Sequence, residues 1–199
     1  MAVPVFHLLA GPNGAGKSTL YRALVDDQII GADLVFVNAD LYERDHLQHI
    51  SDPEQRSEAA RQWADSQRAE KLVKNESFVS ETVFSHESKL ALIADAVASG
   101  FAVALYVVAL DDPKRLPARV ERRVQEGGHH VPSERILARY PRTMANLSRA
   151  VNLATTVYLF EAREIEDGGP QLVAVHQSGQ TQVVVEPLPR WVRRVLRAS

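Results

Sequence analysis

Short apolar runs alternate with longer polar segments through the first half of the chain. Four runs are dominated by large apolar side chains, and we expect each to form a strand: residues 3–10, 34–37, 78–79 and 101–110. The segments between them carry helix signals, and we expect helices at residues 17–24, 41–49, 53–74 and 87–98. Strands that alternate with helices are typical of an α/β fold with a mainly parallel sheet.

Two of these segments also indicate their place in the fold. The run at 101–110 (FAVALYVVAL) is almost continuously apolar, as a central parallel strand covered on both faces would be. The helix at 53–74 carries few apolar residues, so we expect an outer or mobile element.

The rest of the chain predicts two more helices, three strands and a terminal helix. Asp112 and Pro113 open a helix that runs to about Glu126, and a second helix spans 133–151 with a kink or break expected near Tyr140, because Pro141 follows. Strands are expected at 155–160, 171–176 and 182–185, the last two joined as a hairpin through Ser178 and Gly179. The closing PRWVRRVLRAS predicts a basic amphipathic helix that docks Trp191, Val192 and Leu196 on the core.

Composition narrows the class of protein. The 199 residues fit one domain, and 23 Lys plus Arg against 25 Asp plus Glu give a net charge of −2, which argues against a nucleic-acid or anionic-membrane partner. The absence of cysteine excludes disulfides, thiol nucleophiles and cysteine-based zinc sites. The longest apolar run is half a membrane span, and the apolar stretch at 3–10 is a poor secretory signal, so we expect a cytoplasmic protein.

The first strand runs directly into a glycine-rich turn. Residues 11–18 (GPNGAGKS) match GxxxxGK[ST] without departure and lie between a predicted strand and a predicted helix. Glycines let backbone N–H groups surround a phosphate, the helix N-terminus favours negative charge, and a lysine ammonium bridges the terminal phosphates. We therefore expect nucleotide binding, with Mg²⁺ on the Ser18 hydroxyl, at Gly11, Pro12, Asn13, Gly14, Ala15, Gly16, Lys17, Ser18 and Thr19.

Such a loop occurs in kinases, switch GTPases and motor ATPases. The chain has no NKxD-type run that would read guanine, and 199 residues leave little room for a motor core. The expected fold is therefore a P-loop NTPase three-layer αβα sandwich of kinase type. We expect one domain over residues 1–199, with an arginine-rich helical lid at about 113–150 and C-terminal strands and helix at 155–199.

Carboxylates follow three of the predicted strands. Asp40 ends the second strand, where ligands of open α/β sheets bind, and a carboxylate there can accept the proton of an attacking alcohol; the alternative is a helix N-cap. Glu81, after the third strand, suits a substrate hydroxyl or a magnesium-bound water, with a structural role equally open. Asp111 and Asp112 are better explained by helix capping.

Arginines gather around a flexible GGHHVP turn at 127–132. Residues 119–142 hold six arginines against three glutamates, a local excess of +3. The planar fork of arginine suits phosphate oxygens, so we expect phosphate contacts from Arg119, Arg123, Arg139 and Arg142, with Arg122 and Arg135 on the surface. His129 and His130 lack the spacing of a metal site, so hydrogen bonding in the hinge is the better interpretation.

Taken together, these motifs resemble a known family. The sequence carries GPNGAGKST, NAD at Asp40, SET at Glu81, RVERRVQEGGHHVP at 119–132 and ILARYPRTMANL at 136–147, which together are similar to the zeta toxin family of P-loop kinases over residues 3 to about 150. Members of that family phosphorylate the 3′-hydroxyl of the amino sugar in UDP-N-acetylglucosamine with ATP or GTP.

The resemblance implies roles for particular residues. Lys17 would hold the phosphates, Asp40 would act as base toward the sugar hydroxyl, and Arg139 is the best match to a lid arginine that acts on the triphosphate. Glu81 and Thr82 would face the substrate, and an antitoxin protein would be a partner. Three alternatives stay open: a kinase of another metabolite, a nucleotide-binding regulator that acts through a protein partner, and a nucleic-acid end kinase.

Overall fold

The computed structural model describes residues 2–125, 131–164 and 167–197. Within these residues seven strands form one sheet in the order β2-β3-β1-β4-β5-β6-β7. The strands are β1 (Val5–Ala10), β2 (Phe36–Val37), β3 (Phe78–Thr82), β4 (Ala102–Ala109), β5 (Thr156–Glu161), β6 (Gln171–Gln177) and β7 (Gln180–Val183). The helices are α1 (Lys17–Asp26), α2 (Ala39–His46), α3 (Pro53–Lys74), α4 (Ser88–Ala98), α5 (Leu116–Gln125), α6 (Ser133–Ala150) and α7 (Arg190–Arg197), with a short 3-10 turn at Pro113–Arg115 before α5.

The sheet is parallel from β2 to β5 and antiparallel beyond. Strand β1 lies between β3 and β4, with Leu9 opposite both Glu81 and Tyr106. Strand β4 is almost wholly buried, as its apolar sequence predicts. The expected α/β fold with a mainly parallel sheet is therefore confirmed.

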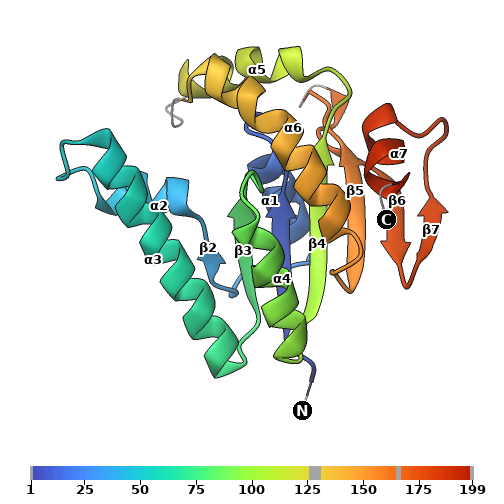
Figure 1. The fold of residues 1–199 in the computed structure, drawn as a ribbon, viewed down its shortest axis with the longest axis horizontal. Coiled ribbons are helices and arrows are strands. Elements are labelled where there is room, and N and C mark those ends of the chain that lie inside the picture. Colours follow the sequence, from blue (N-terminus) through green and yellow to red (C-terminus); the bar gives the residue numbers. More distant parts are fainter. Residues whose placement is uncertain (1, 126–130, 165–166, 198–199) are drawn as a thin grey trace.

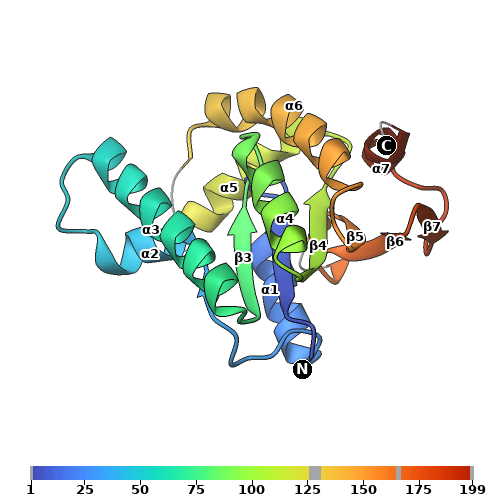
Figure 2. The same cartoon turned by 60° about the horizontal axis from the view of Figure 1, so that its bottom comes forward.

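Helices cover both faces of the sheet, so the core has three layers. Figure 1 shows α4 and α6 in front of the central strands and α1 behind them, and Figure 2 shows the same arrangement after rotation. The carboxyl ends of the parallel strands point to the top of Figure 1, beneath α5 and the start of α6. Loops that follow β1, β2 and β3 therefore meet at one edge of the sheet.

Three local expectations need correction. Helix α6 continues through Pro141 as one helix, so the expected alternative of a break is wrong, while the alternative of a kink stays a prediction. The hairpin between β6 and β7 does turn at Ser178 and Gly179, but β7 spans 180–183 rather than 182–185, because a two-residue turn leaves no room for a longer loop. Helix α2 begins at Ala39 and ends at His46 rather than spanning 41–49.

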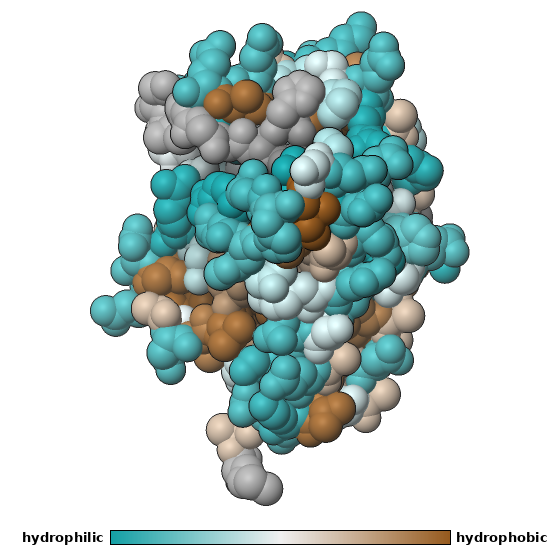
Figure 3. Space-filling model, turned by 90° about the vertical axis from the view of Figure 1, so that its left-hand side faces the viewer, coloured by the Kyte–Doolittle hydropathy of each residue, from teal (hydrophilic) through white to brown (hydrophobic). Residues whose placement is uncertain are grey.

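Helix α3 lies beyond β2 at one end of the sheet and has the bounds that its sequence predicts. Most of its residues are exposed or half-buried. Figure 3, which looks at this side of the molecule, shows mainly hydrophilic side chains with scattered apolar ones. The expectation of an outer element is confirmed.

The terminal helix α7 is anchored at its first turn and along one face. Trp191 and Val192 are buried and Leu196 is partly buried against the core, as expected. The Asp111 carboxylate accepts hydrogen bonds from the backbone N–H groups of Arg190 (3.0 Å) and Trp191 (2.7 Å), while Asp112 accepts one from Lys114 N–H (3.0 Å). Both aspartates therefore cap helices, although Asp111 caps a helix far away in the sequence.

No helix in the described parts of the chain combines the length and the apolar character needed to cross a membrane.

We predict that Asp111→Ala lowers the free energy of unfolding by about 1 to 2 kcal/mol, because two N–H groups of α7 lose their acceptor. Chemical denaturation measures the change. Asp95→Ala removes an exposed carboxylate from the middle of α4 and should stay within about 0.5 kcal/mol of the parent. Equal losses in the two variants would contradict the capping role.

Candidate functional site

The loop between β1 and α1 depends on glycine for its shape. Gly11 has φ 146°, and a Cβ there would lie 2.1 Å from the carbonyl oxygen of Val108 in β4. Gly16 has φ 103° at the position that caps α1. A larger residue at Gly11 would collide with backbone, so the loop needs glycine to lie against the sheet.

The geometry of the loop fits an anion. Gly16 has no side chain that could cap α1, so the first N–H groups of this helix face the loop without a side-chain acceptor. Asn13 is buried, and its Oδ1 has no hydrogen-bond partner among the described residues. A helix N-terminus and a buried polar atom without a partner are features that a bound nucleotide would satisfy.

Lys17 lies inside the loop. Its side chain is 6% exposed, and Nζ donates to the carbonyl oxygens of Gly11 (3.0 Å) and Pro12 (3.1 Å). Burial lowers the pKa of Lys17, and the negative charges of Glu81 and Asp40 oppose this shift. The ammonium is thus held by loop carbonyls, lies 3.7 Å from the Glu81 carboxylate and is influenced by the charge of Asp40.

Glu81 joins three parts of the site. Its Oε2 accepts hydrogen bonds from Ser18 Oγ and from Asn38 Nδ2, both at 3.1 Å, and its Oε1 lies 3.7 Å from Lys17 Nζ. Strand β3 pairs with both β1 and β2, so the end of β3 lies between the glycine loop and the start of α2. The structure therefore brings Lys17, Ser18 and Glu81 together.

Asp40 lies in the first turn of α2 and is exposed. The N-cap of this helix is Asn38, whose Oδ1 accepts from Leu41 N–H at 3.2 Å. The capping alternative for Asp40 is therefore wrong. Its charge raises the pKa of Lys17 and also the pKa of Arg139, so Asp40 is close enough to both cations to influence them electrostatically.

Arg119 extends from α5 onto the glycine loop. Its Nε donates to Gly14 O (2.8 Å), Nη2 donates to Arg163 O (2.9 Å), and Nη1 pairs with Glu164 (3.1 Å). Burial lowers the pKa of Arg119, and Glu164 counteracts it. Arg119 therefore packs the loop against the segment after β5.

The other three predicted arginines differ in their surroundings. Arg139 is half-buried, and burial together with the charges of Arg135 and Arg142 lowers its pKa, whereas Asp40 raises it. The positive charge of Arg123 contributes to the lowered pKa of Lys17, so Arg123 lies near the loop. Arg142 is exposed, one turn along α6 from Arg139.

The C-terminal half of α6 packs into the core. Thr143 Oγ1 donates to Val83 O and Asn146 Nδ2 donates to Phe84 O, both at 3.1 Å, so α6 is fastened to the turn after β3. The exposed Arg122 and Arg135 lie on the surface as expected. A lid over 113–150 stays a prediction, and its hinge residues Gly127, Gly128, His129 and His130 lie outside the described residues.

Two threonines show only structural contacts. Thr82 Oγ1 accepts from Phe84 N–H at 3.2 Å within the turn after β3. Thr19 is half-buried in α1, and a Cβ on Gly169 would lie 3.6 Å from its Cγ2. Neither contact tests the predicted substrate and nucleotide roles.

The residues present fit a magnesium ion held mainly by phosphates and water. Ser18 and Glu81 offer two oxygen ligands 3.1 Å apart, and Mg²⁺ usually takes only one or two protein oxygens at a nucleotide site. In the described chain no three His, Cys, Asp or Glu side chains gather as a metal site of their own.

Sequence reasoning missed two residues of this site. Asn38 caps α2 and donates to Glu81, and neither role was predicted from the sequence. Glu164 pairs with Arg115, Arg119 and Arg122. No local signal marks Glu164, because its partners lie more than 40 positions away in the sequence.

Comparisons with known proteins show the family and the fold. The model of the family described as Zeta toxin matches residues 2–168. Among solved structures, a chain of the PezAT chromosomal toxin–antitoxin system of Streptococcus pneumoniae is similar with a TM-score of 0.63 and 16% identity, covering 81% of this chain and 68% of the other.

Two structures of the complex of AvrRxo1-ORF1 with AvrRxo1-ORF2 are also similar. The structure with sulphate ions has a TM-score of 0.68 and 18% identity, covering 97% of this chain and 63% of the other. The structure with ATP has a TM-score of 0.65 and 20% identity, covering 91% and 60%. The present chain thus spans about two thirds of the length of these relatives, or somewhat less.

No curated protein matches the sequence closely enough to count as a relative. The likeness to the solved structures shows the fold, and the family model covers most of the sequence, including the glycine loop, Asp40, Glu81 and Arg139. The chain belongs to the zeta toxin family of P-loop kinases.

Proposed function

We propose that this protein transfers the γ-phosphate of ATP to a hydroxyl group of a nucleotide sugar, with UDP-N-acetylglucosamine as the acceptor. The meeting of Lys17, Ser18 and Glu81 at the ends of β1 and β3 is the observation that supports it, and Asp40 begins the neighbouring helix α2, near enough for its charge to act on Lys17. A phosphate site and a carboxylate base on neighbouring strand ends are what phosphoryl transfer to an alcohol requires.

The reaction would be an in-line displacement. The acceptor oxygen forms a bond to the γ-phosphorus, the bond from that phosphorus to the β–γ bridging oxygen breaks, and ADP leaves. Asp40 takes the proton of the acceptor hydroxyl. Lys17, drawn from the loop carbonyls that now hold it, stabilises the negative charge on the β- and γ-phosphates.

Ser18 and Glu81 would hold Mg²⁺ at the phosphates. Bound there, the ion would neutralise the charge that develops on the phosphate oxygens. Glu81 also contacts Asn38, the N-cap residue of α2. The Nδ2 group of Asn38 donates to Glu81, and its Oδ1 accepts from Leu41 N–H. Glu81 would then have both a functional and a structural role, because its carboxylate lies beside Ser18, the proposed magnesium ligand, and also accepts a hydrogen bond from Asn38.

Arginines would complete the charge balance. Arg139 is the proposed catalytic arginine, since the Asp40 charge acts on its pKa and it is half-buried. Arg123 lies near Lys17, and Arg119 and Arg142 are the remaining proposed nucleotide contacts. Arg119 forms an ion pair with Glu164, so it would have to break that ion pair before it could contact a phosphate.

A protein partner is a further part of the proposal. The similar chain from Streptococcus pneumoniae comes from a toxin–antitoxin system, and the AvrRxo1 structures contain a second protein, ORF2. We infer an antitoxin-like partner. We also infer that residues 1–199 fold as one kinase domain and that the protein is cytoplasmic. A regulator that binds nucleotide and acts only through such a partner is the second candidate function.

One experiment separates these functions. The protein is incubated with labelled ATP or GTP, Mg²⁺ and a panel of UDP-sugars, nucleosides, free sugars and oligonucleotides, and each product is identified by mass. We expect a phosphorylated UDP-N-acetylglucosamine. Transfer to a different acceptor would redefine the substrate, and no transfer to any acceptor would favour the regulator.

We predict that Asp40→Ala reduces phosphoryl transfer by about 10²- to 10⁴-fold while ATP binding stays nearly unchanged, because the variant lacks only the proton acceptor. Initial rates and fluorescent-nucleotide titration measure the two quantities. Asp45→Ala, at an exposed aspartate of the same helix, is the matched control and should keep the parental rate. Transfer near the parental rate in the Asp40 variant would remove Asp40 as the base.

We predict that Arg139→Gln lowers the transfer rate by about 10³-fold or more, because the half-buried cation proposed to contact the transferred phosphate is lost. Arg135→Gln changes an exposed arginine one turn earlier on α6 and should leave the rate within a factor of about two. Equal effects of both substitutions would indicate general electrostatics rather than a specific contact.

A further inference from the structure

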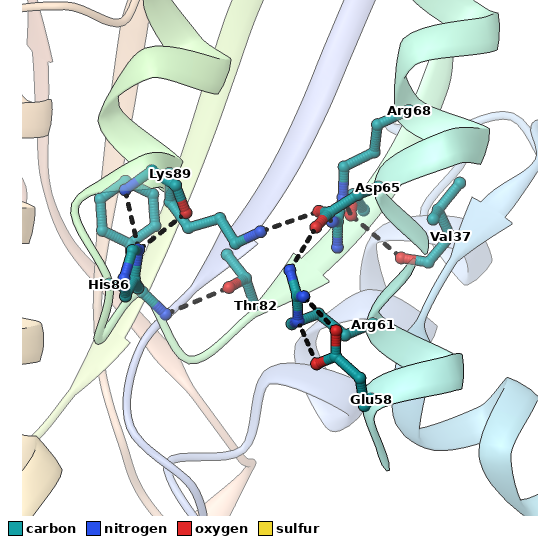
Figure 4. Close-up of polar contacts among 11 residues, drawn as sticks. Val37, Glu58, Arg61, Asp65, Arg68, Thr82, His86 and Lys89 are labelled. Atoms are coloured by element: carbon teal, nitrogen blue, oxygen red, sulfur yellow. Dashed lines mark hydrogen bonds and ion pairs between the residues drawn. The ribbon is translucent and has the colours of Figure 1, made fainter. Parts of the chain in front are cut away.

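The polar helix α3 sends one buried arginine toward the sheet (Figure 4). Arg68 is 4% exposed, although most of its helix is open to solvent. Its Nε donates to Ser80 Oγ at 2.9 Å, and its Nη1 donates to Asp65 Oδ1 at 2.6 Å. Ser80 itself is wholly buried in β3.

The chemistry of these groups sets the direction of each hydrogen bond. An arginine Nε can only donate, so the Ser80 oxygen must accept from it and can direct its own hydrogen elsewhere. That hydrogen points to the carbonyl oxygen of Val37 in β2, 3.0 Å away. Arg68, Ser80 and Val37 therefore form a one-way relay of hydrogen bonds from α3 into the sheet.

The two relay members in the sheet, Ser80 and Val37, each lie close in sequence to a carboxylate of the proposed active site. Ser80 directly precedes Glu81 in the chain, and Val37 precedes the turn that begins α2 with Asp40 in its first turn. Val37 and Ser80 are register partners in the pairing of β2 with β3. One serine hydroxyl thus connects the two strand ends from which the carboxylates project.

Strand β2 has little else to hold it. It comprises only Phe36 and Val37 and lies at the edge of the sheet, so few backbone hydrogen bonds fix its carboxyl end. The side-chain bond from Ser80 to Val37 O adds a contact where the strand pairing stops.

Asp65 extends the relay to α4. Its carboxylate accepts from Arg68 and also from Lys89 Nζ (3.0 Å) and Arg61 Nη1 (3.2 Å), as Figure 4 shows. Burial lowers the pKa of Arg68, and Asp65 opposes that shift. Desolvation of a buried cation costs free energy, and an apolar residue at such a position often gives the folded state equal stability. The contribution of Arg68 to stability therefore does not by itself explain why an arginine occupies this position.

We propose that Arg68 is a positioning residue of the phosphotransferase: through Ser80 it holds the Asp40 and Glu81 segments at the spacing that transfer requires. This inference rests on the proposed function for its catalytic consequence. Arg68 acts on the site through Ser80 and Val37 rather than on the substrate.

The test uses three variants and one control. Arg68→Met removes the donor, Ser80→Ala removes the relay hydroxyl with little change in volume, and the double variant removes both. Arg61→Gln is the control, because Arg61 is exposed, lies on the same helix and contacts the same Asp65 but does not reach Ser80. If Arg68→Met fails to fold, Ser80→Ala alone carries the test.

Two measurements are made on each variant. Amide hydrogen exchange should become faster in peptides that cover 35–42 and 78–83, with no change in β4, because only the two strand ends lose a constraint. In the transfer assay with ATP and UDP-N-acetylglucosamine, kcat should fall about 10- to 100-fold while the KM for ATP changes less than about threefold. The double variant should be no worse than either single one, because both substitutions break the same relay.

The outcomes separate the two proposals. Unchanged exchange in Ser80→Ala overturns the positioning role, and so does faster exchange with an unchanged kcat. Additive losses in the double variant, or an equal loss in Arg61→Gln, overturn it as well. A parental protein that transfers no phosphate counts against the proposed acceptor only, since the exchange measurement still decides whether Arg68 holds the two segments.

Discussion

The contacts of the Glu81 carboxylate are the interactions on which the candidate site depends. This side chain accepts from Ser18 and Asn38 and faces Lys17, so it joins the glycine loop, the end of β3 and the start of α2. Parallel pairing of β3 with its two neighbours makes this meeting possible. The same charge stabilises the buried lysine, because without a nearby carboxylate an ammonium in this loop would be costly.

Helix α6 combines two tasks in one element. Its C-terminal half is part of the core and is fastened through Thr143 and Asn146 to the turn after β3. Its N-terminal half carries Arg139 toward Asp40. An arginine on a helix anchored in this way is held at a defined height above the strand ends, which suits a group that must meet a developing charge in one place.

The polar helix α3 contacts the sheet through a buried arginine, which its polar composition does not indicate. Its exposed side pairs charges along the helix, as Arg61 does with Glu58, whereas Arg68 passes inward to Ser80. A helix with so little apolar surface is held to the sheet partly by directed hydrogen bonds. Hydrogen bonds require particular donor and acceptor positions, so they constrain orientation more closely than apolar packing does.

The order of elements, the glycine loop with Lys17 and Ser18, and the carboxylates near strand ends could all be predicted from the sequence, because periodicity, turn residues and short motifs are local properties of the chain. Three further features depend on how the chain folds: Asn38 rather than Asp40 caps α2, Asp111 caps the distant α7, and particular cations pair with particular acids. Arg119 with Glu164 and Arg68 with Ser80 illustrate the reason. Each arginine has several acceptors within reach of its long side chain, and the choice among them follows from how the sheet brings distant segments together.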